Sequence, residues 1–136
     1  LQQEGPQSFV TIMVAIDNMT VENGCLRICT GPWTEQNHCE VIPPEDDGNP
    51  DGGGRAGAIP TTAADSLDFT NILCTSGDVV AFNGWAPHRS AVNRSPFPRR
   101  AVFLTYNPKR QGDFHKRYYE RMAEIRTEWR TRVGLS

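Results

Sequence analysis

Residues 77–108 read GDVVAFNGWAPHRSAVNRSPFPRRAVFLTYNP and carry the pattern that decides the fold. The branched and aromatic run at 79–82 predicts a strand, and residues 100–106 (RAVFLTY) predict a second one. Between them, residues 83–98 are rich in glycine, proline and small polar residues, which favours a loop. His88 emerges from that loop, so a single histidine lies between two strands of a β structure.

The chain before this stretch continues the β pattern. Residues 8–17 (SFVTIMVAID) predict a buried strand, and residues 25–29 alternate in a way typical of a second strand after the Asn23-Gly24 turn. A further short strand is expected within residues 67–74. About five short strands joined by turns predict a mainly β protein, an antiparallel sandwich or jelly roll.

The C-terminal segment is the one helical pattern. Asp113 follows Gly112 as a good N-cap, and the helix is expected over residues 113–133. Its apolar residues fall on one stripe: Phe114, Tyr118, Met122, Ile125, Trp129 and Val133. Such a stripe is typical of a helix that packs on a sheet. Residues 44–57 concentrate glycine, proline and acidic residues, which predicts a flexible loop.

Composition excludes several classes of function. A net charge of -2 over 136 residues gives no electrostatic footprint for nucleic acid. No apolar run reaches the roughly 20 residues that a membrane span needs, and no signal peptide opens the chain. The four cysteines form no CxxC pair, so we expect reduced thiols in an intracellular, cytoplasmic protein. Nothing in the composition indicates the oligomeric state.

Taken alone, the polar residues around His88 leave the function open. A lone histidine is more often a hydrogen-bonded structural residue than a metal ligand. Arg99 and Arg100 fit a solvated pair at a strand edge. Ser90 and Asn93 fit ordinary turn positions.

Their spacing, however, resembles a known family. His88, Ser90 and Asn93 form H-x-S-x-x-N, and Arg99 follows the histidine by eleven residues. This pattern is similar to the C-terminal signature of the phytanoyl-CoA dioxygenase family. Residues 16–26 (IDNMTVENGCL) resemble the family's strand, acidic turn and E-N-G-x-L segment, in the family's order.

The resemblance extends over residues 9–106 and implies a fold. That fold is a double-stranded β-helix, a cupin-like jelly roll, with a C-terminal α-helix. Only its later strands would be present here. Residues 1–136 would then form the C-terminal part of one jelly-roll oxygenase domain.

The resemblance also implies a metal and a cosubstrate. The family's Fe(II) is held by two histidines and one carboxylate, with the remaining positions open for 2-oxoglutarate and O2. His88 matches the distal iron-binding histidine. Arg99 matches the residue that binds the far carboxylate of 2-oxoglutarate. Ser90 matches a residue whose hydroxyl helps to hold the same carboxylate. Asn93 belongs to the same cosubstrate site, where its role is expected to be geometric.

Arg100 competes with Arg99 for that role. Neighbouring residues of a strand point to opposite faces, so only one of the two enters the barrel, and the family spacing selects Arg99. The implied reaction is hydroxylation of a small-molecule C–H bond by O2, with 2-oxoglutarate converted to succinate and CO2. The segment from Leu104 to Tyr119 resembles the family's small-substrate bacterial branch more than its acyl-CoA branch.

The sequence departs from the family at the other iron ligands. No His is followed two residues later by Asp, and His38 and His115 fit surface positions. The family places its H-x-D on the strand just before the one at 8–17, which would be upstream of Leu1 or only a few residues away. This chain alone is therefore expected to be inactive. Two alternatives stay open: a metal-free jelly-roll binding or scaffold module, and a cupin-like binder in which Arg99 and Ser90 hold a carboxylate.

Overall fold

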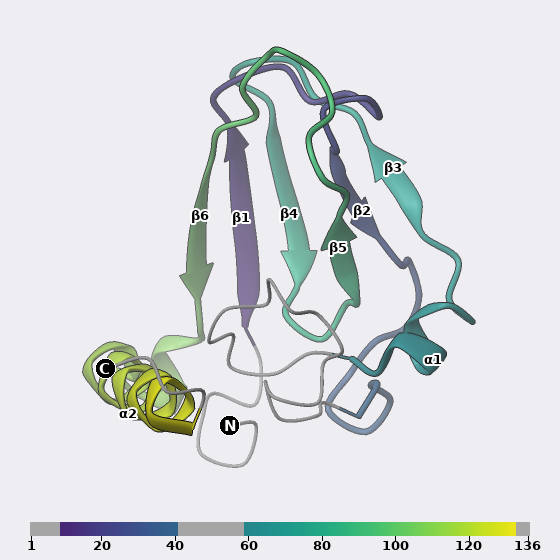
Figure 1. The fold of residues 1–136 in the computed structure, drawn as a ribbon. Coiled ribbons are helices and arrows are strands. Elements are labelled where there is room, and N and C mark those ends of the chain that lie inside the picture. Colours follow the sequence, from purple (N-terminus) through teal and green to yellow (C-terminus); the bar gives the residue numbers. More distant parts are fainter. Residues whose placement is uncertain (1–8, 41–58, 133–136) are drawn as a thin grey trace. The chain divides into compact units, whose positions relative to one another are not determined.

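The computed structural model describes residues 9–40 and 59–132 (Figure 1). The chain divides into two compact units. The β unit comprises Ser8–His38 and Leu67–Pro108, and the helical unit comprises Leu1–Gln7, Cys39–Ser66 and Lys109–Ser136. The loop expected at residues 44–57 lies outside the described residues.

The β unit is built from two antiparallel sheets of three strands each, in the orders β4-β1-β6 and β3-β2-β5 (Figure 1). The strands are β1 Val10–Ala15, β2 Leu26–Ile28, β3 Thr70–Ile72, β4 Val79–Asn83, β5 His88–Ser90 and β6 Ala101–Tyr106. Successive strands change sheet between β1 and β2, β3 and β4, β4 and β5, and β5 and β6. This alternation defines a jelly roll, so the fold class expected from the sequence is confirmed.

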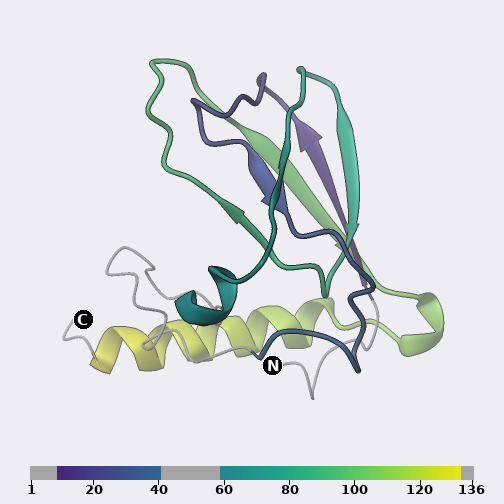
Figure 2. The ribbon, with the colours of Figure 1, turned by 90° about the vertical axis from the view of Figure 1, so that its right-hand side faces the viewer.

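Three of the crossovers, β1–β2, β3–β4 and β5–β6, lie together at one end of the β unit, at the top of Figure 1. The turned view shows β1 and β4 on one side and β2 and β5 on the other (Figure 2). Contacts tie the crossovers to each other. The amide N–H of Ser76 donates to Asn18 Oδ1 (2.9 Å), and Met19 and Cys74 form a β-bridge.

The two sheets share one apolar core. Met13 and Ala15 of β1 are two residues apart and therefore point to the same face, where each is 1% exposed. Phe82 of β4 and Leu26 and Ile28 of β2 complete the centre of this core. Cys25, Cys29 and Cys74 are buried free thiols.

One strand contradicts the sequence-based expectation. His88–Ser90 form β5 inside the segment that we expected to be a loop. All three residues are polar and exposed, so no apolar alternation marks the strand. It exists because it pairs with β2, where Leu26 lies opposite Ser90 and Ile28 opposite His88. A partner 62 residues away in the chain decides the structure here, and local propensity does not.

The helical unit contains the short helix α1 (Thr61–Ala64), a 3-10 turn (Lys109–Gln111) and the long helix α2 (His115–Arg132). Asp113 caps α2, because its Oδ1 accepts a hydrogen bond from the His115 amide at 2.9 Å. Among the side chains of the expected apolar stripe that the structure describes, Met122 is buried and Tyr118 is half exposed. Within the described ranges, no helix has the length and apolar character needed to cross a membrane.

Candidate cosubstrate and metal site

His88 lies at the start of β5 with its side chain on the core side of the sheet. Its strand partner is Ile28, which is buried, and directly paired residues of antiparallel strands project to the same face. His88 Nδ1 lies 3.0 Å from the carbonyl oxygen of Ala86. A carbonyl only accepts, so Nδ1 is the donor in this contact, and in the neutral imidazole Nε2 is then the nitrogen with the lone pair. This is the tautomer that a metal-binding imidazole needs, with its other nitrogen fixed by a backbone acceptor.

Two neighbours complete the surroundings of this imidazole. The ring of Phe82 packs against His88 with 5.1 Å between centroids, on the apolar side. Ser90 lies two residues further along β5 and opposite Leu26, so its hydroxyl is on the same face as His88. Both His88 and Ser90 are exposed, so a ligand can reach them from outside the protein.

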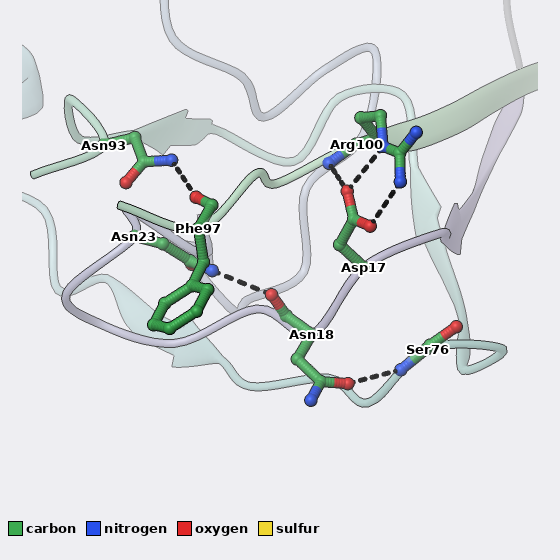
Figure 3. A network of polar contacts seen from close by, with 7 residues as sticks. All are labelled: Asp17, Asn18, Asn23, Ser76, Asn93, Phe97 and Arg100. Carbon is green, nitrogen blue, oxygen red and sulfur yellow. Dashed lines mark hydrogen bonds and ion pairs between the residues drawn. The ribbon is translucent and has the colours of Figure 1, made fainter. Parts of the chain in front are cut away.

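Arg99 and Arg100 have opposite surroundings. The Nη1 of Arg99 is shielded from solvent and has no hydrogen-bond partner among the residues that the structure describes. Arg100 is instead held by Asp17: its Nε and Nη2 donate to the two carboxylate oxygens, each at 2.8 Å, while its side chain is 71% exposed (Figure 3). The hydrogen bonds from Arg100 lower the pKa of Asp17 to about 2.

Strand alternation explains this difference. The Ile16 amide donates to the carbonyl of Arg100 at 3.0 Å. The pairing between β1 and β6 therefore extends to Arg100, one residue before β6 begins. Ala101 packs against the core opposite Ala15. Arg99 is two residues from Ala101 and belongs to the same face, whereas Arg100 belongs to the outer face. The geometry thus directs Arg99 to the interior.

Asn93 is used by its own loop. Its Nδ2 donates to the carbonyl of Phe97 at 2.7 Å, as Figure 3 shows, and its Oδ1 accepts from the amide and the hydroxyl of Ser95, each at 2.9 Å. These bonds fold residues 93–97 into a compact turn ahead of Arg99. Both polar ends of the amide therefore serve loop geometry in this structure.

The Asn23-Gly24 turn was predicted from the sequence, but the surface on which it packs was not. Asn23 is 3% exposed; its Nδ2 donates to the Asn18 carbonyl and its Oδ1 accepts from the Thr20 amide, both at 2.8 Å. Gly24 has φ +77°, and a side chain there would overlap the carbonyl oxygen of Ala91. The turn therefore packs, backbone to backbone, on the loop that follows Ser90.

Two further contributors escaped the sequence analysis. Asp17 was interpreted only as the end of a strand, although it holds Arg100. The Ala86 carbonyl that fixes the tautomer of His88 is a backbone atom, so no residue type could reveal it. His38 was expected at the surface, and it is exposed there with its ring stacked on Trp85 at 4.8 Å between centroids.

The described residues do not form a complete metal site. They contain no group of three or more His, Cys, Asp and Glu side chains that could hold a metal ion. His88 fits one position of a two-histidine, one-carboxylate set, and the other two positions are not filled within residues 9–40 and 59–132. The described residues fit an anionic cosubstrate better than a metal ion, because the shielded Nη1 of Arg99 has no partner among them.

The chain belongs to the phytanoyl-CoA dioxygenase (PhyH) family, whose model matches residues 1–101. This confirms the resemblance noted in the sequence.

Among characterised relatives, the methylphosphonate hydroxylase of Gimesia maris is 33% identical over 113 residues, which cover 83% of this chain and 38% of that protein. The 2-aminoethylphosphonate dioxygenase of an uncultured bacterium is 32% identical over 88% of this chain and 41% of its own length. Dioxygenase lolE1 of Epichloe uncinata is 34% identical over 82% of this chain and 38% of its own length. The chain thus spans about two fifths of the length of these relatives.

Proposed function

We propose that residues 1–136 are the C-terminal part of the jelly-roll domain of an Fe(II)/2-oxoglutarate-dependent dioxygenase that hydroxylates a small molecule. One observation carries this proposal: of two adjacent arginines, the inward one has a shielded Nη1 that meets no hydrogen-bond partner among the described residues, while the outward one is paired with Asp17. A buried N–H without an acceptor costs free energy unless a ligand supplies one. Membership of a dioxygenase family supports a dicarboxylate as that ligand.

Each site residue then has a distinct task. Arg99 binds the far carboxylate of 2-oxoglutarate through a charge-assisted hydrogen bond, for which a planar guanidinium is well suited. Ser90 adds a hydroxyl to the same carboxylate. His88 presents Nε2 to Fe(II), and its Nδ1–H bond to Ala86 keeps the ring in that tautomer. Asn93 folds the loop that connects these residues.

The reaction follows from the family chemistry. A bound Fe(II) would supply the activation of O2, and the overall reaction would convert 2-oxoglutarate, O2 and a substrate C–H bond to succinate, CO2 and an alcohol. The chain's own contribution is to hold the cosubstrate in one orientation at the metal-binding imidazole. We further propose that the complete protein supplies the remaining histidine and carboxylate ligands outside these 136 residues.

The substrate is proposed to be small and polar. Two relatives are named for methylphosphonate and 2-aminoethylphosphonate, and the residues after β6 resemble the small-substrate branch of the family. Small phosphonates are therefore the first compounds to test.

The test compares the two arginines in the complete enzyme. Arg99→Ala removes a charge-assisted hydrogen bond worth about 1.5–3 kcal/mol. The KM for 2-oxoglutarate should therefore rise roughly tenfold to a hundredfold. Arg100→Ala is the matched control and should raise it much less. Equal or reversed effects in an assay of succinate release would contradict the assignment of Arg99.

A second candidate is a metal-free jelly-roll module that binds a carboxylate without catalysis. The described residues contain no group of three side chains that could hold a metal ion, and this favours a metal-free module. Titration of the complete protein with Fe(II) separates the two functions: a non-catalytic module binds no stoichiometric iron and forms no succinate.

A further inference from the structure

The carboxylate of Asp17 holds the chain at the point where β6 begins. Asp17 Oδ2 accepts hydrogen bonds from the backbone N–H and the Nε of Arg100, and Oδ1 accepts one from Nη2, all at 2.8 Å (Figure 3). The carbonyl of Arg100 accepts from the amides of Ile16 (3.0 Å) and Asp17 (3.3 Å). Both backbone polar groups of Arg100 are therefore fixed by two consecutive residues of the neighbouring crossover.

We propose that Asp17 is the positioning residue for Arg99: by fixing Arg100 on the outer face, it holds Arg99 toward the interior, where the far carboxylate of 2-oxoglutarate binds. This inference rests on the proposed function. The physical reason is the alternation of an extended chain, in which the direction of one side chain fixes that of its neighbour. Arg99 precedes β6 (Ala101–Tyr106), so the alternation of the strand reaches it only through Arg100, whose backbone is bonded to Ile16 and Asp17.

Asp17 is itself held in place. It is followed by Asn18, whose side-chain oxygen accepts from the Ser76 amide and whose carbonyl accepts from Asn23, as drawn in Figure 3. The Asp17 side chain is 17% exposed, against 71% for Arg100. A partly buried carboxylate on a hydrogen-bonded backbone therefore serves as the fixed point, and the solvated Arg100 side chain is held against it.

The bonds to Arg100 are not equivalent, which makes the proposal testable. Arg100→Ala removes the guanidinium but keeps the backbone N–H bond to Asp17. Asp17→Ala removes all three side-chain bonds, and Asp17→Asn keeps one acceptor oxygen. If Asp17 acts by positioning, the loss of cosubstrate affinity should follow the order Asp17→Ala, Asp17→Asn, Arg100→Ala, from largest to smallest.

Asp78→Ala provides a matched control in a neighbouring crossover. Asp78 also caps a turn with its carboxylate, accepting from the amide (2.7 Å) and the hydroxyl (2.9 Å) of Thr75, but it makes no side-chain bond to β6. Its removal reproduces the loss of a turn carboxylate without touching Arg100.

The experiment measures 2-oxoglutarate binding by calorimetry to the complete, Fe(II)-loaded enzyme without O2, and KM and kcat with O2. Asp17→Ala should weaken binding and raise KM about tenfold, which is about 1.4 kcal/mol, and change kcat at saturating cosubstrate less than about twofold. In an Arg99→Ala background, Asp17→Ala should have no further effect, because the two residues act as one unit.

The outcomes are distinguishable. If Asp17→Ala behaves like Asp78→Ala while Arg99→Ala loses affinity, positioning by Asp17 is wrong and the proposed function stands. Independent, additive losses in the double variant also contradict positioning. If Arg99→Ala itself binds 2-oxoglutarate normally, the proposed role of Arg99 fails first. Melting temperatures of all variants identify any that are merely unfolded at the assay temperature.

Discussion

At the scale of single residues, Arg99 and Arg100 share one chemistry and differ only in surroundings. Arg100 is paired with a carboxylate and remains largely solvated, a position where an ion pair contributes little to stability. The Nη1 of Arg99 is shielded from water and finds no acceptor within residues 9–40 and 59–132. Proteins retain such groups where a ligand completes them, and this contrast is therefore stronger support for a site than the presence of either arginine.

The same reasoning applies to His88. In the complete enzyme, His88→Ala removes one of three protein ligands and should abolish succinate formation and weaken Fe(II) binding. His38→Ala removes an imidazole that stacks on Trp85, and it should leave iron stoichiometry unchanged. Iron content after gel filtration and succinate yield check both variants. Normal turnover by His88→Ala would refute its role as a ligand.

The carboxylate of Asp17 should also make the stability of the fold depend on pH. Its pKa in the folded protein is lowered to about 2, below the usual value, so the folded state favours the ionised form. The stability gained from this carboxylate is complete above its unfolded pKa of about 4 and is lost as the pH falls toward about 2. The stability difference between the wild type and Asp17→Asn, measured by urea denaturation, should therefore shrink over that interval. A difference that stays constant from pH 5 to about 2 would contradict it.

At the scale of elements, the turn at residues 18–24 supports the loop that carries the site. Gly24 and Gly77 both have positive φ, but only Gly24 faces a backbone atom where a side chain would stand. Gly77→Ala should cost about 1–2 kcal/mol for the left-handed conformation alone. Gly24→Ala should lower the free energy of unfolding by this amount and by about 1–3 kcal/mol more, because Ala91 has to move. Denaturant midpoints give both values; equal losses would show that the close approach is unimportant.

Strands with local signals could be predicted from the sequence, and the strand without one could not. β1, β4 and β6 are runs of branched and aromatic residues, and each was expected within a few residues of its observed bounds. β5 has three polar residues and depends on β2 for its existence. In the site, spacing selected Arg99 over Arg100, whereas the acceptor for His88 is a carbonyl and the partner of Arg100 lies 83 residues away. Sequence spacing identifies such residues, but their contacts follow only from the folded chain.

At the scale of the whole molecule, the jelly roll is present in its later strands. The edge strands of one described sheet are β4 and β6, and those of the other are β3 and β5. Edge strands with open hydrogen-bonding groups favour pairing with further chain. The relatives' greater length is consistent with additional strands in the complete protein.

The 136-residue chain should therefore be inactive by itself. One imidazole does not hold Fe(II) against water and buffer; the sequence contains no H-x-D, and the described residues form no group of three possible metal ligands. We expect weak iron binding and no succinate above a metal-only control. A longer form of the protein that includes an H-x-D segment should show both activities. Stoichiometric iron binding with 2-oxoglutarate decarboxylation by the short chain would mean that another residue completes the site.

The most direct test of the central claim follows the oxygen atoms. The complete enzyme should be incubated with 2-oxoglutarate, Fe(II), a small phosphonate and oxygen-18 gas, and the products analysed by mass spectrometry. The dioxygenase account predicts one labelled oxygen in succinate for each CO2 released, and the loss of this label in His88→Ala. Unlabelled succinate, or label that persists without His88, would contradict it.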